Sequence, residues 1–167
     1  MSPEQSNSSS QPALVAQMME PVDQLYGNAA RALLKAGFLF ANYVERPCQP
    51  YDLTLAQMDV LSAIAHAEGA SLSCSEIADR TLITKGGITG ILDRLEARGL
   101  VKRIPSRDDR RSVRVRLSAK GVELFRRIHP QKIGCNRSLF EKAFTPEQVK
   151  ELSGLLELLI HSLEDIE

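Results

Sequence analysis

Apolar residues follow a helical period at both ends of this chain. Between about residues 14 and 44 they recur every three or four positions, which predicts one long amphipathic helix with an unusually wide apolar surface. From Val149 to Ile166 the spacing is 3-4-3-4-3, as in a coiled-coil seam. One small domain cannot bury both surfaces, so these end helices are expected to need a partner.

The centre of the chain, residues 72–117, has a different pattern. Ser73 with Glu76 forms a capping box that begins a short helix, and Thr84 caps the next helix, which is expected to end near Arg98. Residues 100–104 are then expected to form a strand, and 112–117 its partner, in which apolar and polar side chains alternate. This order of elements, helix, turn, helix and then a two-stranded hairpin, is typical of a winged helix-turn-helix.

The fold class predicted is therefore mainly α with a small β-wing. Residues 1–13 are read as a flexible tail, 14–50 as a helix and linker, 51–117 as the winged helix-turn-helix, and 118–167 as terminal helices. Pro47 and Pro50 are expected to make the linker extended, and Pro130 to interrupt or kink the helix that Ser118 caps.

Charge is segregated along the chain although the formal net charge is zero. Residues 71–127 carry a net charge of +7, between segments of −4 and −3. Since contacts to phosphates supply most non-specific DNA affinity, this block favours a nucleic-acid reader, with a solvated surface as the alternative. In the helix after Thr84, one face carries short or basic side chains that could approach a groove: Lys85, Gly86, Thr89, Gly90, Asp93 and Arg94.

Several classes of function are excluded or disfavoured by what the sequence lacks. No triad order, phosphate-cradling loop or paired-carboxylate motif appears, so an enzyme is not expected. Three well-separated cysteines and isolated histidines indicate neither a disulfide framework nor a metal site, and no cofactor is expected. No segment predicts a membrane span or signal peptide, so we expect a cytoplasmic protein with no membrane partner.

The segments LTLAQMDVL, SEIADRTLITKGGITGILDRLEARGLVKR and RDDRRSVRVRLSAKG, together with the end helices, resemble the MarR family of bacterial transcription regulators over about residues 18–165. The resemblance implies a homodimer, usually a repressor, that binds a pseudo-palindromic double-stranded DNA operator. Thr84, Lys85, Gly86 and Thr89 would approach bases or phosphates, and Arg94 a phosphate. In the wing, Arg110 braced by Asp108 would enter the minor groove, with Arg107 and Arg111 on the DNA backbone.

The same resemblance implies control by a small aromatic or amphipathic effector bound between the end helices and the winged domain. Candidate cleft residues are Tyr26, Phe40, Tyr43, Ile64 and His66, each of which could equally be ordinary core. Candidate dimerisation residues are Val22, Leu25, Leu33, Leu152, Leu156, Leu159 and Leu163. Two alternatives remain open: redox control through Cys74, at a helix N-terminus, or a protein-interaction module that does not read DNA.

Overall fold

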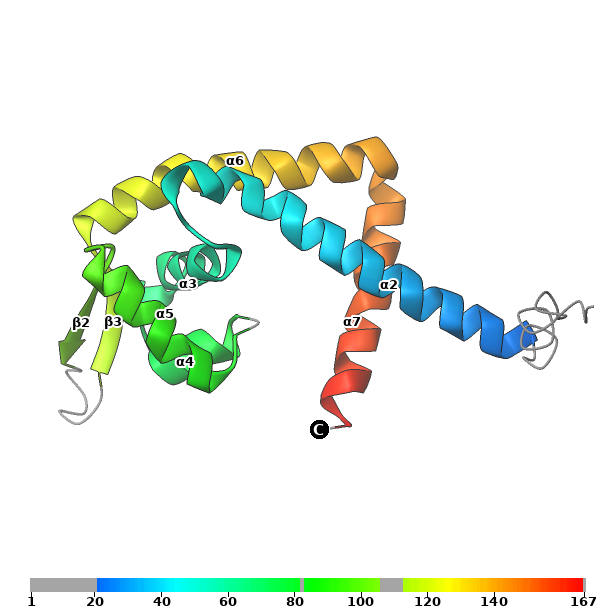
Figure 1. Cartoon of the computed structure of the whole chain (residues 1–167), viewed down its shortest axis with the longest axis horizontal. Coiled ribbons are helices and arrows are strands. Elements are labelled where there is room, and N and C mark those ends of the chain that lie inside the picture. The colour runs from blue at the N-terminus through cyan, green and yellow to red at the C-terminus, as the bar shows by residue number, and fades with distance from the viewer. Residues whose placement is uncertain (1–20, 82, 106–112, 167) are drawn as a thin grey trace, which may run out of the picture. The chain divides into compact units, whose positions relative to one another are not determined.

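A computed structural model describes residues 21–81, 83–105 and 113–166 of the chain (Figure 1). The chain divides into two compact units, the first ending at Tyr43 and the second beginning at Val44. The first contains most of helix α2, Pro21–Glu45, whose apolar side chains are largely exposed. The predicted tail and the start of the predicted first helix lie outside the described residues.

The linker after α2 is not extended, contrary to the prediction. Residues Arg46–Tyr51 form a 3-10 helix, η1, in which Pro47 occupies the first turn and both Pro47 and Cys48 are buried. A proline is tolerated in a first turn because its missing N–H would have no helical partner there. Asp52, with a φ of 52°, ends η1 in the left-handed region, and its N–H bonds back to the carbonyl of Gln49.

The predicted winged helix-turn-helix is present in the second unit. Its helices are α3, Leu55–Ala65; α4, Cys74–Asp79; and α5, Lys85–Ala97, with a short 3-10 helix η2 at Glu68–Ala70. The capping box of Thr54 with Gln57 begins α3, that of Ser73 with Glu76 begins α4, and Thr84 caps α5. The starts of α4 and α5 are therefore confirmed at the predicted residues, Ser73 and Thr84.

The sheet formed by the described residues has three strands, one more than the sequence predicted. Strands β2, Val101–Pro105, and β3, Val113–Leu117, form the predicted antiparallel hairpin, and β1, Ser71–Ser73, adds to the other edge of β3. Leu72 lies opposite Val115, and both are buried. A strand of three residues is too short for its alternation to be recognised in the sequence, so only the pairing with β3 defines it.

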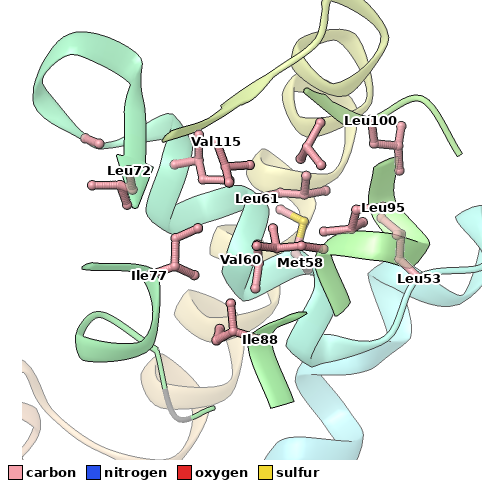
Figure 2. Packing of buried hydrophobic residues seen from close by; sticks show 14 of the residues in the cluster. Leu53, Met58, Val60, Leu61, Leu72, Ile77, Ile88, Leu95, Leu100 and Val115 are labelled. Carbon is pink, nitrogen blue, oxygen red and sulfur yellow. The ribbon is translucent and has the colours of Figure 1, made fainter. Parts of the chain in front are cut away.

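One hydrophobic core holds these elements together (Figure 2). Figure 2 shows Met58, Val60 and Leu61 of α3 between the sheet residue Val115 and the α5 residue Leu95. Ile88, Leu92 and Leu95 are the fully buried face of α5. The opposite face of α5 is therefore exposed on the surface of the domain.

Helix α6, Ala119–Ala143, is continuous through Pro130, so of the two predicted alternatives, an interruption or a kink, the interruption is wrong. Contacts on each side of Pro130 hold the helix: Ile128 is buried in the core, and Lys132 Nζ lies 2.6 Å from Asp59 Oδ1 of α3. Such contacts can offset the backbone hydrogen bond that a proline removes. The last helix, α7, is Pro146–Glu164, and a capping box of Thr145 with Gln148 begins it.

The start of α6 packs tightly on the chain that links α5 to β2. Ser118 Oγ donates to the Gly99 carbonyl at 2.6 Å and accepts from the Gly121 N–H at 2.9 Å. A Cβ at Gly121 would overlap the Leu100 carbonyl oxygen, so only glycine fits there. The end of α5, the start of β2 and the start of α6 are therefore one packed junction.

Candidate nucleic-acid interface

The outer face of α5 carries every recognition-helix residue named from the sequence. Thr84 Oγ1 accepts from the Gly87 N–H at 3.3 Å and so fixes the first turn. The six predicted contact residues are all exposed: Thr84, Lys85, Gly86, Thr89, Gly90 and Arg94. The structure thus brings them together on one accessible helix face, opposite the buried one.

Two of the glycines on this face have no packing reason to be glycine. An added Cβ at Gly86 or Gly90 would meet no atom within 4 Å, whereas at Gly87 it would lie 3.2 Å from Ile83 Cγ2. Close packing within the fold therefore explains, at most, Gly87. Open space outside Gly86 and Gly90 is what a closely approaching duplex would require.

The sequence suggested that Asp93 faces a groove. In the structure its carboxylate is instead paired with an arginine. Arg103 of β2 binds it, with Nη2 at 2.6 Å from Asp93 Oδ1, and also binds Glu96, with Nη1 at 2.5 Å from Glu96 Oε2. The hydrogen bond to Asp93, followed by the bond and charge of Glu96, raises the pKa of Arg103 despite its partial burial. Sequence reading missed this arginine because its partners lie seven and ten positions away.

Two further arginines of the basic block hold the fold. Arg98 at the end of α5 donates to the carbonyls of Tyr51, at 2.7 Å, and Asp52. Arg114 of β3 donates to the Ser71 carbonyl at 2.6 Å and lies 3.4 Å from Glu76. Hydrogen bonds from Ser73, with a smaller contribution from Arg114, lower the pKa of Glu76. Not every cation counted in this block is therefore free to donate hydrogen bonds to phosphates.

Four other cations of the block differ from these arginines in the described part of the chain. Within the described ranges, Lys85, Arg94, Lys102 and Arg116 are exposed and have no carboxylate partner. Lys102 and Arg116 lie directly opposite each other across β2 and β3. Like charges in such a pair are destabilising unless an anion lies near. These side chains are available for phosphates. The predicted wing residues Arg107, Asp108, Arg110 and Arg111 lie outside the described residues.

The predicted cleft residues separate into two groups. Tyr26, Phe40 and Tyr43 are on α2, in the first unit, while Ile64 and His66 are at the end of α3. Ile64 is fully buried in the core cluster. His66 is exposed, and its ring lies 5.2 Å from that of His129 and 5.8 Å from that of Phe125, centre to centre. No pattern along the chain indicated that the two histidines would meet.

An open pocket of about 440 Å³ lies beside this ring cluster. Its lining comes from α3, η2, β3 and α6, with Ile64, Leu117 and Phe125 as apolar members and Arg116 and Arg126 as cations. Such a lining suits a small amphipathic anion. Cys74, the redox candidate, is a half-buried free thiol at the first position of α4.

Comparison with known proteins identifies the family to which this interface belongs. The chain is 32% identical over 129 residues to the homoprotocatechuate degradative operon repressor of Escherichia coli, covering 77% of this chain and 85% of that one. Residues 51–112 also match the model of the MarR family. The chain belongs to the MarR family. It is accordingly a DNA-binding transcription regulator, and its relatives are regulators rather than enzymes.

Solved structures of MarR-family regulators share the fold of this chain. Sco3205 from Streptomyces coelicolor, in complex with DNA, aligns with a TM-score of 0.77 and 25% identity over 87% of this chain and 89% of that one. BpsR of Bordetella bronchiseptica, whose DNA binding is regulated by 6-hydroxynicotinic acid, aligns with a TM-score of 0.70 and 25% identity over 78% and 91%. No helix in the described part of this MarR-family chain is long and apolar enough to cross a membrane.

Proposed function

We propose that this MarR-family regulator is a homodimeric repressor of a pseudo-palindromic operator, released by a small aromatic or amphipathic ligand. The observation that carries the proposal is the accessible outer face of α5, beside cations without carboxylate partners. Repression is supported by the E. coli relative, which is an operon repressor. A protein-interaction module has no comparable support.

Unburied apolar side chains on the end helices support the dimer. On α7, Leu156, Leu159 and Leu163 of the predicted seam are between 37% and 55% exposed in the single chain, and on α2 Leu25 is 64% exposed. Contiguous apolar surface of this kind marks an interaction site in a monomer. A second copy of the chain would cover it, and two winged domains would then read two half-sites one helical turn apart.

The dimer and its DNA reading are tested together by gel-shift and by mass in solution. The full-length protein should have the mass of two chains and bind a duplex from its own promoter region, with affinity that falls steeply as salt rises. Arg110→Ala should weaken DNA binding while leaving dimer mass and helicity unchanged. A salt-insensitive complex would contradict DNA reading, and an unaltered affinity would remove the wing from it.

The pocket beside Phe125 supports a ligand of aromatic-acid character. Its apolar residues would contact a ring, and Arg116 and Arg126 a carboxylate. Homoprotocatechuate and 6-hydroxynicotinic acid, named for two relatives, are both aromatic acids. The test is release of the protein–DNA complex by a panel of such acids. Arg126→Ala should raise the concentration needed for release, whereas Arg127→Ala, whose guanidinium pairs with Glu123, should not.

A further inference from the structure

Arg103 occupies the junction between the recognition helix α5 and the first wing strand β2. Its guanidinium binds two carboxylates one turn apart on α5, at 2.6 Å from Asp93 and 2.5 Å from Glu96. The backbone N–H of Arg103 also donates to Glu96 Oε1 at 3.2 Å. Both the main chain and the side chain of β2 are therefore attached to α5 at this point.

These contacts make Arg103 unavailable to DNA. Its charge is opposed by two carboxylates, and its side chain is only 29% exposed. An arginine that released both partners for a phosphate would leave two negative charges beside the DNA-facing surface. In this respect Arg103 differs from Arg94, which is exposed and has no carboxylate partner among the described residues.

The position of Arg103 in the sheet links the wing to α5. It lies opposite Val115 in the β2–β3 pair, and β2 ends two residues later at Pro105. Val115 is fully buried, so the hairpin is fixed to the core at this register. The direction in which the hairpin leaves the domain is thus set at the residue that binds α5.

We propose that Arg103 is a positioning residue, which holds the wing at a fixed angle to the recognition helix so that both reach one duplex together. The proposal rests on the DNA reading proposed above and adds a residue to it that need not touch DNA. Partly exposed ion pairs contribute little to stability, so the domain should fold without this one. Its loss should therefore appear in DNA recognition.

The sharpest test uses a variant that makes the domain more positive. Asp93→Asn with Glu96→Gln removes two negative charges, which by electrostatics alone should strengthen binding to any DNA. The matched control, Asp79→Asn with Glu68→Gln, removes the same charges from exposed positions without partners among the described residues. The probe is a duplex that the wild-type protein selects from random DNA, compared with a scrambled duplex of the same composition.

We expect the control to bind both duplexes more tightly and to keep the ratio of the two affinities. The Asp93–Glu96 variant should lose about tenfold in that ratio, equivalent to one misplaced base-pair contact. Arg103→Lys keeps the charge but cannot bind both carboxylates as the guanidinium does. This variant should show part of the same loss in the affinity ratio. Circular dichroism checks that each variant is folded.

An unchanged ratio in the Asp93–Glu96 variant and in Arg103→Lys would overturn the positioning role. If the wild-type protein itself selects no duplex from random DNA, the proposed DNA-reading function fails. This result differs from an unchanged ratio, which overturns only the role of Arg103. If the Asp93–Glu96 variant is unfolded, the expectation that these ion pairs contribute little to stability is wrong. The effect of Arg103 on recognition is then measured with Arg103→Lys alone.

Discussion

Gly90→Ala should stabilise this protein and weaken its binding to DNA. Gly90 is the sixth residue of α5, and an added Cβ there meets no atom within 4 Å. Alanine is favoured over glycine in a helix interior by about 1 kcal/mol, and with no contact to disturb, the full gain should be realised. For a chain of this length, that gain raises the Tm by about 2–4 °C.

DNA affinity should change in the opposite direction. Gly90 is on the exposed face of α5, where the approach of a duplex would fill the space that the Cβ takes. We expect at least about a tenfold loss of operator affinity, which corresponds to about 1.4 kcal/mol. The assay pairs thermal unfolding by circular dichroism, at one fixed protein concentration, with anisotropy of a labelled operator duplex.

Gly134→Ala is the matched control for Gly90→Ala. Gly134 is an exposed interior residue of α6 with nothing within 4 Å of an added Cβ, and it lies outside the winged domain. This variant should gain similar stability and bind DNA like the wild type. A Gly90→Ala protein that is more stable and binds the operator with wild-type affinity would refute the reasoning that DNA approach accounts for this glycine.

Three other perturbations test the packing, the pH dependence and the dimer. Gly121→Ala should lower stability by about 1–3 kcal/mol or more in thermal unfolding, because its Cβ overlaps the Leu100 carbonyl; an unchanged Tm would contradict the tight junction. Burial, then His66 and Lys132, lower the pKa of His129 below its usual 6.5. The unfolded chain therefore takes up a proton first, so stability should be full above about pH 6.5 and fall below it. His129→Gln should flatten this fall in denaturant titrations, and an equal slope would assign the fall to other groups. Leu163→Glu should give single chains in sedimentation and weaker DNA binding, whereas His161→Glu, on the opposite face of α7, should remain dimeric. Equal masses for the two variants would mean that the seam is not the interface.

Local patterns were sufficient for most elements of the winged domain. Each capping residue predicted from the sequence, Ser73, Thr84 and Ser118, accepts the expected backbone bond, because a cap depends on residues within one turn of itself. The exposed face of α5 followed from the same periodicity that placed Ile88, Leu92 and Leu95 inside. Two of the differences lie where distant segments act: β1 forms only by pairing with β3, and contacts of Ile128 and Lys132 with other elements flank Pro130 in the continuous α6.

The sequence by itself determined the helix starts, the hairpin, the family resemblance and the basic character of residues 71–127, since each depends on neighbours along the chain or on residue type. Tertiary structure decided which of those basic residues can meet DNA. Arg98, Arg103 and Arg114 are bound to carbonyls or carboxylates, while Lys85, Arg94, Lys102 and Arg116 have no carboxylate partner among the described residues. Charge is a property of composition, but its availability depends on partners that only the fold brings within hydrogen-bonding distance.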